Sequence, residues 1–187
     1  CPPRPLSPYA VAKLSSEHYL DAYRHQHGLE FTVLRYANIY GPRQVPHGEA
    51  GVVSIFMDNL VKGLASELNR FPEDEAGMVR DYTYVGDVVE ANVAALGSGG
   101  GEVVNIGTGR GTKTADLYRV VYETVRRFRP DLPDTLARPT PRPARPGDIP
   151  RSCLRVERAE RVLGWRPRTA LGEGVLETLR WRLGQSY

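Results

Sequence analysis

The chain has 187 residues, of which 41% are apolar and 25% charged, and this composition excludes a disordered or fibrous protein. The net charge is +3, but no basic stripe with interleaved aromatic residues is present, so the sequence favours discrete anions such as phosphates over nucleic acid as partners. No apolar run approaches the roughly 18 residues of a membrane helix, and the two cysteines lack metal-ligand spacing and fit a reducing cytoplasm. We therefore expect a cytoplasmic protein of one or two domains with no membrane partner.

Local signals predict a helix at the start of the chain, followed by alternating strands and helices. Ser7 is a suitable N-cap with Pro8 in the first turn, and Gly28 can adopt the left-handed conformation that ends a helix. An apolar, β-branched run follows and predicts a buried strand; this order is typical of α/β proteins. The predicted elements are helix 8–27, strand 31–36, helix 52–63, short strands within 66–85 around a turn at 72–77, helix 87–96, strand 102–106, and helices 114–128, 156–163 and 171–183.

Tyr9 and Lys13 stand four residues apart in the first predicted helix, so their side chains share one face about one turn apart. A lysine ammonium beside a phenol favours the phenolate, and such a tyrosine can take a proton from a sugar hydroxyl and return it. The alternative is a surface tyrosine beside a solvated lysine, because this spacing occurs by chance in many helices. The sequence thus provides a candidate acid–base pair.

Two further segments carry polar side chains next to predicted strands. Asn38 follows strand 31–36, where ligands of open α/β sheets bind, although it could merely cap the turn. By strand periodicity Arg80 and Tyr82 point to one face and Asp81 to the other. The Arg80 guanidinium is suited to phosphate oxygens, and the alternative is a surface pair with Asp81 that contributes little.

Residues 129–150 hold seven prolines and predict an extended connector with little regular structure. Arg145 and Asp148 flank Pro-Gly in this connector and offer recognition of a phosphate and a hydroxyl, or else they are solvated loop charges. The former reading needs support from other parts of the chain.

The glycine-rich segment Gly107–Gly111 follows a predicted strand, as phosphate-binding loops do. It lacks the Gly-x-Gly-x-x-Gly spacing, so the sequence favours a tight turn over a dinucleotide site. His18, His25 and His27 lack a matching carboxylate or cysteine pattern, so we interpret them as surface or interface residues and predict no metal site.

Several sequence blocks occur in a fixed order along nearly the whole chain. The blocks are Ser-Pro-Tyr-Ala-x-x-Lys (7–13), Arg-Tyr-x-Asn-x-Tyr-Gly-Pro-Arg (35–43), Val-Arg-Asp-Tyr-x-Tyr-Val-x-Asp-Val (79–88), Asn-Ile-Gly-Thr-Gly (105–109), Arg-Pro-Gly-Asp (145–148) and Leu-Gly-Trp-x-Pro (163–167). Together they resemble the extended short-chain dehydrogenase/reductase family, and within it the nucleotide-sugar epimerases and dehydratases. The similarity is greatest to UDP-glucose 4-epimerases, whereas dTDP-glucose 4,6-dehydratases and UDP-glucuronate decarboxylases share most of the blocks.

The resemblance implies NAD-dependent epimerisation at C4 of a UDP-hexose through a 4-keto intermediate. Tyr9 would be the acid–base group at the sugar 4-hydroxyl, Lys13 would hold the nicotinamide ribose, and Tyr36 would lie near the nicotinamide. Asn38 and Arg80, helped by Arg145, would bind the diphosphate. Val52, Val53 and Asp148 would bind around the nucleoside, and Tyr82 is a further substrate-binding position.

The resemblance further implies the C-terminal part of a Rossmann-like protein. Residues 1–38 and 86–109 would be remnants of the NAD-binding domain, and 39–85 and 110–187 a smaller α/β domain for the nucleotide sugar. The family's glycine-rich dinucleotide loop has no counterpart here, so we expect that the N-terminal half is absent and that this stretch alone does not turn over. A homodimer through the Tyr9 helix is expected, and the alternative of another class is a non-catalytic UDP-sugar-binding or interaction module.

Overall fold

The computed structural model describes residues 3–46, 51–98 and 100–184. The helices are α1 (Pro8–His27), α2 (Val52–Val61), α3 (Val85–Gly97), α4 (Thr114–Phe128), α5 (Glu157–Leu163) and α6 (Leu171–Arg182), with a short 3₁₀ helix at Asp134–Ala137. The strands are β1 (Thr32–Tyr36), β2 (Asn38–Tyr40), β3 (Glu67–Arg70), β4 (Val79–Tyr84), β5 (Glu102–Ile106), β6 (Gly111–Lys113), β7 (Thr140–Pro143) and β8 (Arg151–Ser152).

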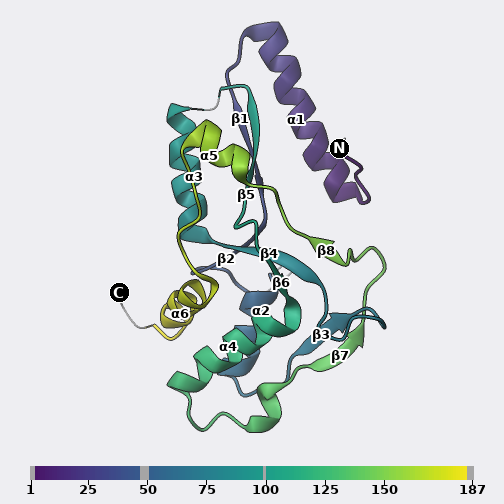
Figure 1. Cartoon of the computed structure of the whole chain (residues 1–187), viewed down its shortest axis with the longest axis vertical. Coiled ribbons are helices and arrows are strands. Elements are labelled where there is room, and N and C mark those ends of the chain that lie inside the picture. The colour runs from purple at the N-terminus through teal and green to yellow at the C-terminus, as the bar shows by residue number, and fades with distance from the viewer. Residues whose placement is uncertain (1–2, 47–50, 99, 185–187) are drawn as a thin grey trace.

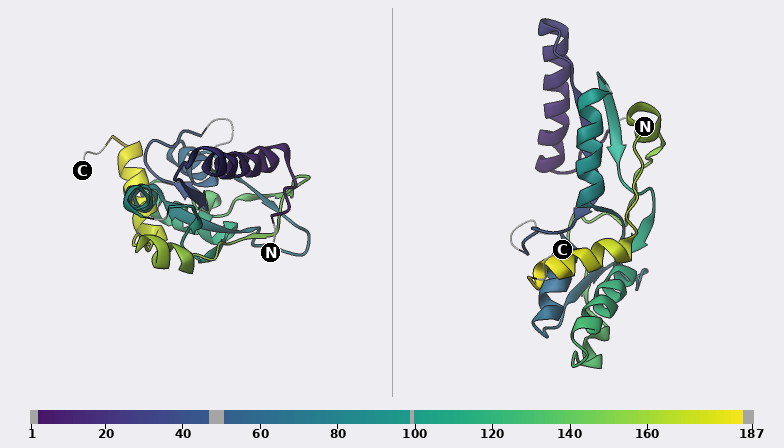
Figure 2. Two further views of the ribbon diagram at one scale, coloured as in Figure 1. Left: turned by 90° about the horizontal axis from the view of Figure 1, so that it is seen from above. Right: turned by 90° about the vertical axis from the view of Figure 1, so that its left-hand side faces the viewer.

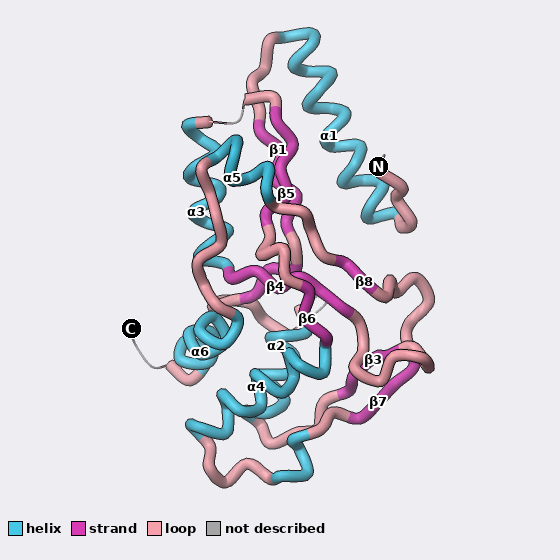
Figure 3. Tube along the Cα trace, viewed as in Figure 1, coloured by secondary structure: helices cyan, strands magenta, loops and turns pink. Residues whose placement is uncertain are grey.

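The molecule is elongated, with an upper and a lower half in the orientation of Figure 1. The upper half contains α1, β1, α3, β5 and α5, and the lower half contains the other elements. Strands β1, β5, β2, β4 and β6 run through the middle of the molecule, and β3, β7 and β8 lie at its right-hand side in Figure 3. The α/β order predicted from the sequence is confirmed, and the predicted helices and long strands are found within a few residues of their expected ends.

In the upper half, β1 and β5 form a parallel pair in which Thr32 stands opposite Glu102. The apolar faces of α3 and α5 cover this pair, because each is amphipathic and buries its small and branched side chains. Their core consists of Val88, Ala91, Val104, Ile106, Ala159, Leu163 and Trp165. The expected domain division placed α5 and Trp165 with the lower half, whereas the structure packs Ala159, Leu163 and Trp165 against β5 in the upper core.

Helix α1 forms as its end signals predict. The Ser7 hydroxyl accepts a hydrogen bond from the Ala10 amide at 3.1 Å, and Gly28 ends the helix in the left-handed conformation with φ of 68°. None of its 20 residues is buried. It lies along one flank of the upper half, as the two views of Figure 2 show.

The lower half is built on the sheet β2–β4–β6, in which β2 is parallel and β6 antiparallel to β4. Strand β8 also pairs with β4, opposite Val79 and Arg80. Helices α2, α4 and α6 supply the larger core of the molecule around Phe56, whose ring meets the Tyr118 ring edge-on at 4.9 Å. The short strands β2, β6 and β8 were not predicted, because three or fewer residues carry no periodic signal.

The proline-rich connector is more regular than the sequence predicts. Strand β7 includes Pro141 and Pro143 and pairs in parallel with β3. The amides of Thr140 and Ala144 donate to carbonyls of residues next to or in β3, so the two prolines fall at positions that donate nothing. Proline is tolerated in an edge strand for this reason.

Candidate functional site

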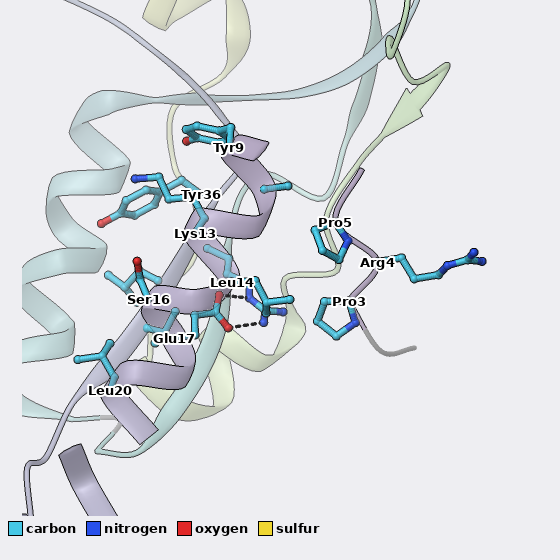
Figure 4. Close-up of a pocket in the computed structure, with 14 residues that line it drawn as sticks. Pro3, Arg4, Pro5, Tyr9, Lys13, Leu14, Ser16, Glu17, Leu20 and Tyr36 are labelled. Atoms are coloured by element: carbon cyan, nitrogen blue, oxygen red, sulfur yellow. Dashed lines mark hydrogen bonds and ion pairs between the residues drawn. The ribbon is translucent and has the colours of Figure 1, made fainter. Parts of the chain in front are cut away.

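A cavity of about 580 Å³ lies between α1 and β1 and is called the α1 cavity below. Tyr9, Lys13 and Tyr36 line it, and they are the three side chains that the sequence assigned to acid–base chemistry and to the cofactor (Figure 4). Tyr9 lies in the first turn of α1 and is 62% exposed, and Lys13 Nζ is 5.4 Å from the centre of its ring. Tyr36 ends β1, and its hydroxyl donates to Asn92 Oδ1 at 2.9 Å.

An ion pair in the same cavity was not foreseen. Both Glu17 carboxylate oxygens accept hydrogen bonds from Arg35, at 2.7 Å from Nε and 2.5 Å from Nη2. The hydrogen bond to Glu17 raises the pKa of the Arg35 guanidinium, and burial opposes this in part. The signal in the sequence was the four-residue spacing from Lys13 to Glu17, which places Glu17 on the same face of α1.

A second cavity of about 600 Å³ lies in the lower half and is called the β4 cavity below. It is lined by elements far apart in the chain, because β4 is central in its sheet and both α2 and the proline-rich connector border it. The side chains assigned to substrate from the sequence converge here with one exception: Asn38, Val52, Arg80, Tyr82, Arg145 and Asp148 all line the cavity.

The exception is Val53, which is 1% exposed and packs in the core beneath α2 instead. Adjacent residues on a helix point about 100° apart, and in α2 this places Val52 at the cavity and Val53 in the core. Several lining residues were not predicted from the sequence, since isolated polar residues on a helix or short strand carry no motif; these are Asn59, Glu67, Asn69 and Thr114.

The positive charges at the β4 cavity are not neutralised within the described residues. Arg80 Nη1 donates to the carbonyls of Val79 at 2.9 Å and Ile149 at 2.8 Å, so the guanidinium is fixed by neutral groups. In the part of the chain that the structure describes, neither Arg80 nor Arg145 forms an ion pair with a carboxylate. Two such guanidinium groups suit an anion with several oxygens, such as a diphosphate.

The turn that carries Arg145 is held by two hydrogen bonds between Arg145 and Asp148. The Asp148 carboxylate accepts from the Arg145 amide at 2.8 Å, and the Asp148 amide donates to the Arg145 carbonyl at 3.0 Å. Opposite this turn, Tyr82 is buried, and that burial raises the pKa of its hydroxyl. Tyr82 is therefore a neutral hydrogen-bonding group at neutral pH.

The Gly107–Gly111 segment forms a tight turn whose amides are already occupied. Asp81 is 1% exposed, and its carboxylate accepts from the amides of Thr108 at 2.9 Å and Gly109 at 3.0 Å and from the Thr108 hydroxyl at 2.6 Å. A Cβ on Gly107 would meet Asp81 Oδ2 at 2.6 Å, so glycine is required there. The segment turns tightly as the sequence predicts, with the Thr108 and Gly109 amides bound to Asp81, and the Arg80–Asp81 surface pair does not form.

Neither a metal site nor a membrane-spanning helix is found among the described residues. Within the described ranges no three His, Cys, Asp or Glu side chains are arranged to hold a metal ion. None of the described helices combines the length and the apolar character that crossing a membrane requires.

Comparison with known sequences gives consistent relatives. A family model described as GDP-mannose 4,6 dehydratase matches residues 1–178. A UDP-glucose 4-epimerase of Mycolicibacterium smegmatis is 42% identical over 181 residues, covering 96% of this chain and 54% of that protein. A dTDP-glucose 4,6-dehydratase of Escherichia coli is 27% identical over 183 residues, or 97% of this chain and 49% of that protein. The chain spans about half the length of the curated relatives it matches.

Solved structures agree with this fold. The UDP-glucose 4-epimerase of Thermotoga maritima, determined with UDP-glucose, superposes with a TM-score of 0.88 at 42% identity, covering 97% of this chain and 55% of that one. The Thermus thermophilus UDP-glucose 4-epimerase, in complex with NAD, gives a TM-score of 0.79 at 44% identity, covering 97% and 56%. The α/β fold is therefore that of the C-terminal portion of such enzymes.

Proposed function

The chain belongs to the GDP-mannose 4,6 dehydratase family of nucleotide-sugar epimerases and dehydratases, and from this premise we propose that it forms the substrate-binding portion of an NAD-dependent UDP-hexose 4-epimerase. The observation that carries the proposal is the presence on one chain of the Tyr9–Lys13 pair and of a second cavity with two arginines that have no carboxylate partner among the described residues. Relatives at 42% and 38% identity named as UDP-glucose 4-epimerase, one of them putatively, support UDP-hexose over other nucleotide sugars.

The β4 cavity fixes the substrate in this proposal. Arg80 and Arg145 bind the diphosphate through their forked donors, and Asn38, the first residue of β2, contributes a side-chain amide. Val52 and Asp148 lie on the far elements, α2 and the connector, and contact the nucleoside. Holding these parts orients the sugar and removes the entropic cost of finding the reactive geometry.

The α1 cavity carries the proton chemistry. Tyr9 removes the proton from the sugar 4-hydroxyl as C4 is oxidised, and returns it when the 4-keto sugar is reduced on its other face. Lys13 stabilises the phenolate with its ammonium, and Tyr36 borders the same space. Tyr9, Lys13 and Tyr36 are the residues of this chain that would contact NAD, which when bound supplies the hydride acceptor and donor. Only Ala37 separates Tyr36 in the α1 cavity from Asn38 in the β4 cavity.

The experiment that tests the proposal joins this chain to the N-terminal portion of the Mycolicibacterium smegmatis relative and measures conversion of UDP-galactose to UDP-glucose with NAD. We expect turnover that falls at least about 100-fold in Tyr9→Phe, because general acid–base catalysis contributes at least that factor. Tyr19→Phe, an exposed tyrosine of the same helix, should retain turnover. No turnover in a folded, NAD-bound protein would contradict the epimerase, and turnover by the 187-residue chain alone would contradict its dependence on the missing portion.

Two alternatives have specific support. The E. coli relative supports a dTDP-glucose 4,6-dehydratase. The resemblance of the sequence blocks keeps a UDP-glucuronate decarboxylase as a further alternative, and product analysis with dTDP-glucose and with UDP-glucuronate separates them. The β4 cavity lies wholly within this chain, which favours a non-catalytic UDP-sugar-binding or interaction module. UDP titrated into the chain alone should bind, and Arg80→Met should weaken binding about tenfold. Binding without turnover in the assembled protein would favour the module.

Assembly as a homodimer through α1 is part of the proposal. Tyr19 and Tyr23 are 70% and 53% exposed on a helix that buries none of its residues, which supports an interface there. Sedimentation velocity of the assembled protein should give a dimer that Tyr19→Glu dissociates, and a monomer in both cases would contradict this interface.

A further inference from the structure

Helix α1 carries a carboxylate on the same face as its Tyr–Lys pair. Tyr9, Lys13 and Glu17 stand at intervals of four residues, and each lines the α1 cavity. Opposite charges at this spacing attract each other on a helix, so Glu17 is a natural partner for the Lys13 ammonium. An ion pair at this spacing, with the acid first in the chain, forms elsewhere, since Lys62 Nζ lies 2.7 Å from Asp58 Oδ2.

Glu17 and Lys13 nevertheless do not pair in the structure. The Glu17 carboxylate is bound to β1 through both oxygens, which accept from the Arg35 fork at 2.7 Å and 2.5 Å, as the dashed lines in Figure 4 mark. The Lys13 ammonium lies over the Tyr9 ring instead and forms no ion pair with any described residue. A bidentate pair of this kind is stronger and more fixed than an end-on contact with lysine.

We propose that Arg35 is a positioning residue that keeps Lys13 beside Tyr9 by holding the Glu17 carboxylate away from it. Loss of the Arg35 guanidinium frees Glu17 to pair with Lys13 along the helix, and the ammonium then moves away from the Tyr9 ring. The consequence for turnover rests on the role of Lys13 in the proposed function. The arrangement of charges, however, belongs to this chain and can be measured without turnover.

The chain has three lysines, which makes the Lys13 ammonium measurable by chemical labelling. Acetylation with a limiting amine-reactive ester, followed by mass spectrometry, reports how free each ammonium is. Lys62 and Lys113 are ion-paired with carboxylates in the structure and serve as internal references. In the wild-type chain Lys13 should therefore react faster, relative to exposure, than either reference.

Arg35→Met should lower the ratio of Lys13 to Lys62 labelling about twofold, because a helical i, i+4 ion pair of typical strength is formed for roughly half of the time. Glu17→Gln in the Arg35→Met background should restore the ratio, because no carboxylate remains to pair with Lys13. Arg35→Lys keeps the charge without the fork and should give a smaller fall. The control Arg158→Met removes an exposed ion pair with Glu102 in the same half and should leave the ratio unchanged.

An unchanged ratio in a folded Arg35→Met chain overturns the proposal. A fall that Glu17→Gln does not reverse also overturns the proposal. In that case the fall comes from losing the Arg35–Glu17 contact between α1 and β1, which removal of the Glu17 charge cannot restore, and not from pairing of Glu17 with Lys13. Turnover of the assembled protein is measured in the same variants. The labelling can follow the expected pattern while turnover stays constant. That result supports the positioning of Lys13 by Arg35, and it contradicts the role of Lys13 in the proposed function.

Discussion

At the scale of single residues, the neighbouring side chains Arg80 and Asp81 on β4 face opposite sides of the sheet. Arg80 faces the β4 cavity, whereas Asp81 is buried and its carboxylate accepts three hydrogen bonds from Thr108 and Gly109. This follows from strand geometry, in which successive side chains alternate between faces. The alternation was readable from the sequence, but the partner of Asp81 was not, because the turn at residues 107–111 is 27 residues further along the chain.

Asp81→Ala should lower the free energy of unfolding by about 2 kcal/mol, because it removes a buried carboxylate and leaves the Thr108 and Gly109 amides of the turn without their acceptor. Urea unfolding of the chain, followed by circular dichroism, measures this change. The matched control is Asp116→Ala, which removes an exposed pair with Arg119 and should change stability by less than about 0.5 kcal/mol. Equal effects of the two substitutions would show that the turn does not depend on Asp81.

At the scale of elements, the Asp58 carboxylate links helix α2 to the end of helix α6 in the lower half. Asp58 on α2 accepts from Lys62 on the next turn and from Arg182 at the end of α6, and its side chain is 15% exposed. The hydrogen bond from Lys62, followed by that from Arg182, lowers the pKa of Asp58. A lowered folded-state pKa stabilises the fold at pH values above the unfolded-state pKa, and this stabilisation is lost as the pH falls through the folded-state value.

Asp58→Asn should therefore destabilise the chain by about 1–2 kcal/mol at pH 7, with a difference from wild type that shrinks as the pH falls below about 4. Urea unfolding of both proteins at several pH values between 7 and 3 checks the sign. A difference that stays constant with pH would mean that the charge of Asp58 contributes nothing. Asp116→Asn again serves as the exposed control, with little expected effect at any pH.

How far the sequence predicts the elements depends on their length and on local signals. α1 was predicted to the residue because Ser7, Pro8 and Gly28 act locally. β7 was not predicted, because its pairing depends on the distant β3. Pro141 and Pro143 also indicate a non-strand segment in the sequence, and only the observed hydrogen bonds from Thr140 and Ala144 show that the two prolines need not donate. Val53 was assigned to the site with its neighbour because a block match does not say which of two adjacent helical residues faces the cavity.

At the scale of the whole molecule, the upper half is an incomplete sheet. β1 pairs with β5 on one side, and no other described strand lies along its second edge. Space is open on both sides of this edge, in the α1 cavity and in a cavity of about 600 Å³ lined by Phe31, Leu34, Asn92 and Leu96 among others. An exposed strand edge attracts pairing by another segment. The relatives are about twice as long as this chain, so we expect the portion of the relatives that this chain does not match to complete the sheet when it is added.

Hydrogen exchange distinguishes the two edges of β1. Alternate amides of a strand point to opposite neighbours, so alternate β1 amides should exchange fast in the chain alone and slow by at least about 100-fold when the N-terminal portion of the Mycolicibacterium smegmatis relative is added. β4 pairs on both sides within this chain, so its amides should exchange slowly in both states and serve as the control. β1 amides as slow as those of β4 in the chain alone would show that the edge is already covered, by α1 or by a second copy. Protection on addition that is limited to α1 would place the added portion on the helix and not on the sheet.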